Sequence, residues 1–325
     1  MLKKHITKLH AKPGGGGVLY TLSAYILWGI LPIYWKALKQ IPAGEILAHR
    51  IFWSFLLLIA IIVFTKKWPE FKQTFATFKG IMSVIFGSIL ICINWLIYIW
   101  SVNSNHIVEA SLGYYINPLF TILLGMIVLK EKPDKWQFLA LFIATAGVIF
   151  VAIQFGHIPW VALSLAVSFS LYGLVKKLSK VSSLNGLAAE TMIIAPLAFG
   201  YLFYKINDGS GTYSSLPVLV IVFILFSGLI TSIPLLLFSQ GAKRVSLTTL
   251  GFLQYLSPSI SLMLGIFLYK ESFTNTDKIS FGCIWAALAI YSFSRKEVHN
   301  QMIKQFRFKK KEEATDNSTE NVTNL

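Results

Sequence analysis

The chain alternates between long apolar stretches and short polar connections. A helix that crosses a hydrocarbon core of about 30 Å needs roughly 20 mostly apolar residues. Ten stretches approach this length and predict an all-α integral membrane protein with ten transmembrane helices. They cover residues 18–38, 42–64, 81–100, 110–129, 136–155, 158–174, 183–204, 216–239, 246–269 and 279–293.

The composition supports this interpretation and excludes a soluble domain. Apolar residues make up 55% of the 325 positions and charged residues 13%, about half the charged share of soluble domains. The net charge of +15 first suggests nucleic-acid binding, but the basic residues are spread in small clusters between apolar stretches. We therefore expect the lipid bilayer, and no nucleic acid, as the partner. Residues 1–16 and 295–325 are predicted to be a cytoplasmic N-terminal segment and a disordered, basic and polar cytoplasmic tail.

The distribution of basic residues predicts the orientation. With a cytoplasmic N-terminus, 23 lysines and arginines fall on the cytoplasmic side and five on the outer side, while Arg50 lies within a stretch. Cytoplasmic connections of membrane proteins carry an excess of Lys and Arg. This pattern predicts a multi-pass protein of the plasma (inner) membrane with both termini in the cytoplasm.

The sequence contains an internal repeat, which a shift of 140 residues reveals. The identical pairs are Tyr115 and Tyr255, Pro118 and Pro258, Leu124 and Leu264, Gly125 and Gly265, Lys130 and Lys270, and Glu131 and Glu271. We therefore predict two five-helix repeats, 17–155 and 156–294. Five is odd, so the second repeat must be inverted relative to the first. Inverted repeats around a central cavity are typical of transporters that work by alternating access. A channel or a non-transporting membrane sensor, the alternative classes, does not need this symmetry.

Seven motifs resemble one family. They are YILWGILPIY (25–34), EILAHRIFWS (45–54), NWLIYIW (94–100), EASLGYYINPL (109–119), SFSLYG (168–173), ETMIIAP (190–196) and GFLQYLSP (251–258). The chain resembles the drug/metabolite transporter superfamily, and within it the EamA-type members of the RarD (chloramphenicol-sensitivity protein) family. The resemblance implies ten helices around a central cavity. It also implies transport, commonly export, of a small organic metabolite such as an amino acid or a drug-like compound.

Charged side chains within predicted spans are the first candidates for function, because they are costly in a bilayer. Glu45, His49 and Arg50 lie on the second span and Glu190 lies on the seventh. At 1.5 Å per residue, Arg50 lies about 12 Å deep and needs an anionic partner. That partner is either Glu45 or Glu190, in a pair that fixes helix packing, or the substrate. His49 is either a packing histidine or a site for a coupling proton.

Aromatic and amide side chains within the spans form the second candidate set. They are Trp28, Asn94, Tyr98, Tyr114, Tyr115, Asn117, Tyr172, Gln254 and Tyr255. Buried polar groups need hydrogen-bond partners, which either a watered cavity or a neighbouring helix provides. As a group, Asn94, Tyr115, Gln254 and Tyr255 favour the cavity. The duplicated Pro118 and Pro258 are candidate hinges, because proline interrupts the hydrogen bonding of a helix.

The sequence offers little for catalysis. One of the six histidines lies within a span, no aspartate does, and no Cys/His spacing is typical of a metal site. We therefore expect no enzyme activity, catalytic residue, cofactor or metal. Arg50 with aromatic neighbours would suit a partly apolar solute that carries a carboxylate.

Overall fold

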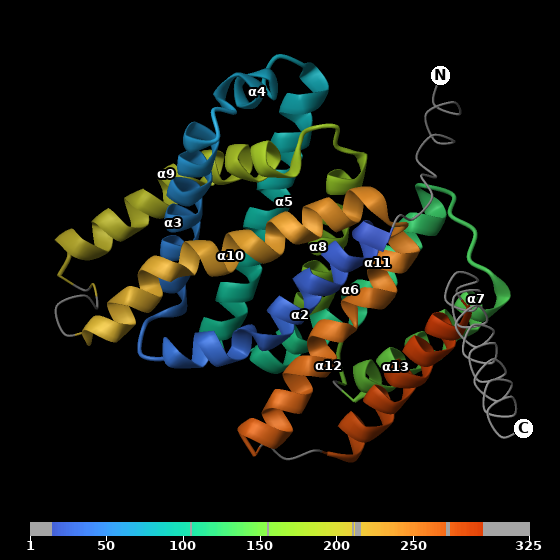
Figure 1. Ribbon diagram of the computed structural model, residues 1–325. Coiled ribbons are helices and arrows are strands. Elements are labelled where there is room, and N and C mark those ends of the chain that lie inside the picture. The colour runs from blue at the N-terminus through green and yellow to red at the C-terminus, as the bar shows by residue number, and fades with distance from the viewer. Residues whose placement is uncertain are drawn as a thin grey trace, which may run out of the picture.

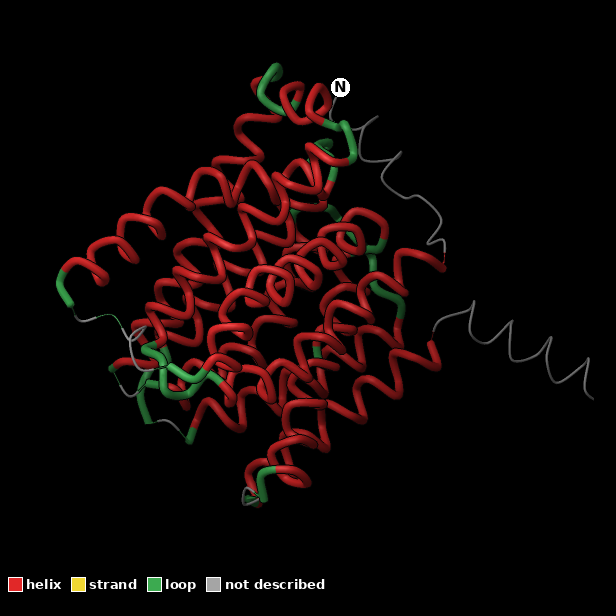
Figure 2. Tube along the Cα trace, turned by 60° about the vertical axis from the view of Figure 1, so that its left-hand side comes forward, coloured by secondary structure: helices red, strands yellow, loops and turns green. Residues whose placement is uncertain are grey.

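Figure 1 shows the computed structural model of the protein, a bundle of helices. The structure describes residues 15–104, 106–154, 156–209, 211, 216–270 and 274–294, and this part of the chain contains no strand. Residues 1–14 of the predicted N-terminal segment and the predicted tail 295–325 lie outside the described residues. The helices lie side by side, with most of the connecting loops at the ends of the bundle (Figure 2).

The helices follow the predicted spans closely. In chain order they are α2 (Gly15–Ala37), α3 (Ala43–Phe64), α4 (Trp68–Gln73), α5 (Phe78–Asn103), α6 (Ile107–Ile127), α7 (Lys135–Ile153), α8 (Trp160–Leu178), α9 (Ser183–Asn207), α10 (Val218–Arg244), α11 (Leu247–Gln254), α12 (Leu256–Met263), the π-helical turn η2 (Leu264–Leu268) and α13 (Asn275–Ser294).

Nine helices of the described residues are long and apolar enough to cross a membrane, with α11, α12 and η2 counted together as one. The predicted tenth span, 279–293, falls in α13, which is not among the nine. This helix packs along α7. The structure therefore supports a multi-pass membrane protein, while the count of ten transmembrane helices stays a prediction.

Polar side chains mark the starts of several helices. The Asp134 carboxylate accepts hydrogen bonds from the backbone N–H groups of Trp136 and Gln137, each at 2.9 Å, and the Gln137 side chain accepts one in return. Ser182 and Ser246 accept hydrogen bonds from the third residue of α9 and α11, respectively. These contacts satisfy N–H groups that have no partner within the helix.

Several helices extend beyond the predicted spans. The helices α8 and α10 include the lysines and the arginine at their C-terminal ends, although the apolar pattern places these residues in connecting loops. Lysine and arginine are good helix formers, so a helix continues past its apolar stretch. We call this end of the bundle, where α8 and α10 end and α9 and α11 begin, the lysine end, because Lys176, Lys177 and Lys243 lie there.

Helix packing pairs the two halves of the chain. The helix α3 packs on α9, α6 on α11, and α7 on α13. Other helix contacts occur in two matched pairs. The contact between α2 and α10 corresponds to that between α5 and α8, and the contact between α6 and α8 corresponds to that between α2 and α12. Exchanging the first five predicted spans with the second five converts one member of each set into the other. Figure 1 shows α3 and α9 at one side of the bundle and α7 and α13 at the opposite side.

The two aligned prolines differ in their surroundings. The helix α6 runs through Pro118 without interruption, whereas the ninth span breaks at Tyr255, between α11 and α12, three residues before Pro258. The aligned residues Lys130 and Lys270 share a left-handed backbone, with φ of 54° and 59°. The aligned pair thus keeps the same local conformation at the end of both helices.

Candidate functional site

Arg50, the eighth residue of α3, lies over two indole rings. Its guanidinium carbon is 4.6 Å from the ring centroid of Trp35 and 5.6 Å from that of Trp95. Its Nε donates a hydrogen bond of 2.9 Å to the hydroxyl of Thr231 on α10. A guanidinium over an indole face is an attractive contact, so the side chain is held in one orientation by α2, α5 and α10.

Three tyrosines complete the surroundings of this guanidinium. Tyr34, Tyr98 and Tyr114 interact with it electrostatically, and Tyr98 and Tyr114 are 37% and 50% exposed. Within the part of the chain that the structure describes, no carboxylate forms an ion pair with Arg50. The site therefore contains a partly buried positive charge whose donors are not saturated by any acid of the described residues.

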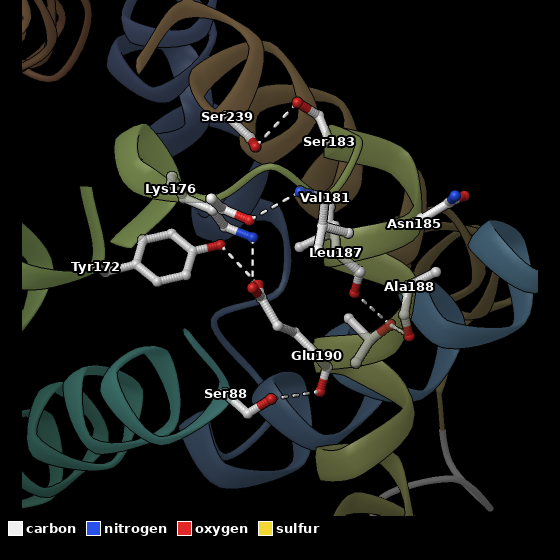
Figure 3. A network of polar contacts seen from close by, with 12 residues as sticks. Ser88, Tyr172, Lys176, Val181, Ser183, Asn185, Leu187, Ala188, Glu190 and Ser239 are labelled. Atoms are coloured by element: carbon white, nitrogen blue, oxygen red, sulfur yellow. Dashed lines mark hydrogen bonds and ion pairs between the residues drawn. The ribbon is translucent and has the colours of Figure 1, made fainter. Parts of the chain in front are cut away.

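Of the alternative partners considered for Arg50, Glu190 is paired with another residue in this structure. Glu190 pairs with Lys176, whose Nζ is 2.5 Å from Glu190 Oε1, and accepts a hydrogen bond of 3.1 Å from the Tyr172 hydroxyl (Figure 3). Both members of the pair are 3% exposed or less at the side chain. The helix α3 packs along α9, but the Arg50 side chain contacts residues of α2, α5 and α10, whereas the long side chain of Lys176 reaches Glu190 across the short connection between α8 and α9.

A glycine makes room for this acid. A Cβ atom at Gly87 on α5 would overlap the Glu190 carboxylate. The hydroxyl of the next residue, Ser88, donates a long hydrogen bond of 3.5 Å to the backbone oxygen of Glu190. The seam between α5 and α9 is therefore closed by direct contact at Glu190.

A cavity of about 380 Å³ lies between α3, α5 and α9. This volume is in the range of small-molecule sites. Its walls are Gly44, Leu47, Ala48, Ile51, Cys92, Trp95, Leu96, Ile99, Asn103, Ile194, Leu197, Ala198 and Tyr201. Trp95 belongs both to this cavity and to the Arg50 site. Gly44, Asn103 and Tyr201 lie near the helix ends opposite the lysine end, so the cavity extends from there toward the middle of the bundle.

The structure brings the predicted amides Asn117 and Gln254 together. The Ser170 hydroxyl donates to Asn117 Oδ1 at 2.9 Å, and the Thr121 hydroxyl contacts Asn117 Oδ1 at 3.3 Å and Gln254 Oε1 at 3.4 Å. All four side chains are buried. This network joins α6, α8 and α11 by hydrogen bonds between helices.

The other predicted residues lie apart from these groups. Asn94 donates hydrogen bonds of 3.0 Å to the backbone oxygen of Leu165 and to the Ser168 hydroxyl, so it joins α5 to α8. Trp28 packs in an aromatic cluster with Tyr25, Phe169 and Phe238.

Tyr115 packs edge-on against Phe281 of α13, with the ring centroids 5.1 Å apart. Tyr255 is fully buried at the break between α11 and α12. Glu45 and His49 are buried on α3, 0% and 9% exposed. The thirteen predicted residues therefore do not form one cluster.

Sequence reasoning missed several functional candidates. Trp35 and Lys176 were not predicted as site residues, yet Trp35 lies against Arg50 and Lys176 pairs with the buried Glu190. The hydroxyls of Thr231, Thr121 and Ser170 gave no signal, because Ser and Thr are common in apolar helices. For Lys176, the spacing of fourteen residues from Glu190, across the end of α8, a short connection and the first eight residues of α9, was the available clue. Among the described residues, no group of three or more His, Cys, Asp or Glu side chains is arranged to hold a metal ion.

Comparison with known proteins gives the family. The EamA-like transporter family matches residues 15–153 and again 158–293. The chain is 47% identical over 282 residues to the uncharacterized transporter YojE of Bacillus subtilis (strain 168), covering 86% of this chain and 94% of that protein. It is 40% identical over 283 residues to protein RarD of Escherichia coli (strain K12), covering 87% and 96%.

A solved crystal structure shares the fold, with a TM-score of 0.66 at 17% identity, over 85% of this chain and 97% of that chain. The predicted resemblance to EamA-type and RarD-type transporters is thus confirmed. The apolar helices and the relatives together identify a multi-pass membrane protein. The chain belongs to the EamA-like transporter family.

Proposed function

We propose that the protein is a secondary transporter that exports a small organic solute bearing a carboxylate, by alternating access. The observation that carries the proposal is Arg50, a positive charge held within a membrane-spanning helix by Trp35, Trp95 and Thr231. Among the described residues it has no carboxylate partner. Keeping an arginine at this depth costs roughly 2.5–3.5 kcal/mol on insertion scales, which a purely structural role does not require.

The geometry of this site suits a carboxylate. A planar guanidinium presents paired donors that match the two oxygens of a carboxylate. The guanidinium lies over two indole rings and its Nε is used by Thr231, so its terminal nitrogens are the donors left for a ligand. The adjoining cavity is mostly apolar and shares Trp95 with this site. An amino acid or a drug-like acid with an apolar body fits this combination.

Three observations support alternating access between inverted repeats. The family matches the chain twice, the helix contacts come in matched sets, and aligned Lys130 and Lys270 share a left-handed backbone. A protein built from two inverted repeats has two nearly equivalent conformations, open to opposite sides. The distribution of basic residues supports cytoplasmic termini, which would place the lysine end inside and the cavity mouth outside.

Metabolite profiling of the growth medium tests this function. A deletion strain is complemented with the wild type, Arg50→Lys or Arg50→Ala, and the medium is analysed for carboxylate-bearing solutes. We expect one solute to accumulate with the wild type and to fall to the level of the deletion strain with both variants, at equal protein in the membrane. Arg244→Lys makes the same chemical change at an exposed residue and serves as the control. Accumulation at the wild-type level with Arg50→Ala would contradict the proposal.

A further inference from the structure

The Lys176–Glu190 pair lies directly beneath the inner end of the cavity. On α5, Ser88 is one helical turn from Cys92, and on α9, Glu190 is one turn from Ile194. Residues four apart lie on the same face of a helix, and Cys92 and Ile194 line the cavity. The seam between α5 and α9 therefore lies between the cavity and the lysine end, and the Glu190 carboxylate closes it.

The Glu190 carboxylate is surrounded by groups of α8, α10 and α5. The helix α8 supplies Lys176 and Tyr172, at 2.5 and 3.1 Å, and Lys243 of α10 interacts with the carboxylate electrostatically. The helix α5 brings Gly87 and Ser88, which carry no charge. Among the described residues, α3 and α4 bring no charged group into its range. Figure 3 shows the two donors of α8 converging on the carboxylate from one side.

We propose that Glu190 takes up a proton from the cavity side before this seam opens toward the lysine end, so that the buried pair couples transport to proton movement. The inference rests on the proposed transport function and adds its coupling ion. Separating the pair leaves two uncompensated buried charges, which is strongly unfavourable. Lys176 and Glu190 differ in how each can avoid remaining an unpaired buried charge.

Lys176 lies in the last turn of α8, so its long side chain can reach water at the lysine end. Glu190 is seven residues into α9, about 10 Å from its start, and has a short side chain. A proton on Glu190 removes its charge when Lys176 leaves. In the closed state this proton can arrive only from the cavity side. After the seam opens, water at the lysine end receives it, and the pair forms again. One proton thus moves toward the lysine end in each cycle, which is inward in the predicted orientation and can drive export.

The test reports on the seam and needs no substrate. Ser88→Cys places a nearly isosteric thiol at the seam, in a protein with Cys92→Ser and Cys283→Ser. The rate of its reaction with a small water-soluble maleimide is measured in proteoliposomes as a function of pH. With Glu190→Gln, which imitates the protonated acid, we expect labelling at least about tenfold faster at neutral pH. The labelling rate with Glu190→Gln, divided by the rate with Glu190 intact, should approach one as the pH falls. This ratio does not depend on the protonation of the thiol itself, which is common to both proteins.

Glu109→Gln is the matched control, because Glu109 is a buried acid that accepts a hydrogen bond from the Val161 N–H at the other end of the bundle. Its labelling should equal that of the protein with all acids intact. If Ser88→Cys does not fold, Leu187→Cys, which is 2% exposed on α9, replaces it. Equal labelling with and without the Glu190→Gln substitution at every pH would overturn the coupling proposal. Since no solute is involved, that result would leave the transport function standing.

Discussion

Arg50 and Glu190, which are 140 residues apart in the sequence, have different kinds of contact in the protein. Glu190 is neutralised by Lys176 within the protein, while Arg50 is held by aromatic rings and one hydroxyl. A buried acid paired with a base is costly to break, whereas a guanidinium among rings retains donors for a ligand. Arg50 is therefore suited to binding a solute, and Glu190 is suited to closing the seam between α5 and α9.

The contact between Gly87 and Glu190 gives a prediction for stability. Gly87→Ala inserts a methyl group where the Glu190 carboxylate lies, and we expect a loss of about 1–3 kcal/mol in the free energy of unfolding, as for other overpacked sites. Gly200→Ala, where nothing lies within 4 Å of the added Cβ, should change little. Thermal unfolding of the purified variants in detergent measures both. In a Glu190→Ala background the Gly87 effect should shrink; an unchanged effect would show that the carboxylate is not what Gly87 accommodates.

The sequence identified Arg50 and Glu190 as charges within spans but did not predict their contacts. Glu190 and Arg50 were identified because acids and bases are rare in apolar helices. Their pairing depends on which of several neighbouring helices faces them, and that follows from packing between residues distant in sequence. Lys176 lies in a run of lysines that also suits a solvated loop, so its burial could not be deduced from its type.

At the scale of helices, one distant acid fixes the start of α11. The Glu131 carboxylate, which follows α6, accepts hydrogen bonds from the N–H groups of Leu247 and Thr248 at 2.7 and 2.8 Å and from the Thr248 hydroxyl at 2.7 Å. A carboxylate at a helix N-terminus is also favoured by the helix dipole. This contact ties the two halves of the chain together at the lysine end. Its aligned residue, Glu271, lies outside the described residues.

Removing this cap should destabilise the protein. We expect Glu131→Ala to lower the free energy of unfolding by about 2 kcal/mol, since it removes hydrogen bonds to a charged group. Glu131→Gln keeps one acceptor and should cost less. Glu70→Ala, which changes an exposed residue of α4, serves as the control in the same denaturation assay. A loss with Glu131→Ala no greater than that with Glu70→Ala would show that the cap contributes nothing.

The break before Pro258 leads to a prediction about the hinge. Pro258 cannot donate a backbone hydrogen bond to the carbonyl of Gln254, four residues earlier, where α11 ends. Pro258→Ala restores the donor, so we expect a straighter and more stable helix together with slower transport. Paired measurements of thermal unfolding and solute efflux test this. Pro118→Ala lies in an uninterrupted helix and should affect efflux less. Efflux at the wild-type rate with Pro258→Ala would argue against a hinge there.

Hydropathy located the helices well and their ends less well. Span positions depend on runs of apolar residues, which the sequence displays directly. Helix ends depend on local caps, such as Asp134 with Gln137, and on distant ones, such as Glu131 on α11. The short helix α4 was not predicted, because six residues between two spans carry no periodic signal.

At the scale of the whole molecule, packing and charge agree on one arrangement. Contacts between helices come in sets that the exchange of the two halves relates, and the basic residues gather on one side of the predicted spans. With five spans in each repeat, as we predict, the two repeats would have opposite orientations in the membrane. The cavity mouth and the lysine end would face opposite sides of the membrane.

Labelling of intact cells tests this orientation. In a protein without Cys92 and Cys283, His157→Cys between α7 and α8 should react with a membrane-impermeant maleimide, and Lys66→Cys after α3 should not. Both positions are exposed, so burial does not explain a difference. Permeabilised cells should show reaction at both. Labelling of Lys66→Cys alone in intact cells would reverse the orientation and, with it, the assignment of export.

The central claim is that Arg50 binds a carboxylate solute that the protein carries by alternating access. Counterflow in proteoliposomes tests it most directly, with the solute identified from the growth medium in excess inside the vesicles and a radiolabelled trace outside. We predict saturable accumulation of label with the wild type and with Arg244→Lys, and none with Arg50→Ala. Non-saturable flux, as through a pore, or counterflow by Arg50→Ala at the wild-type rate would contradict it.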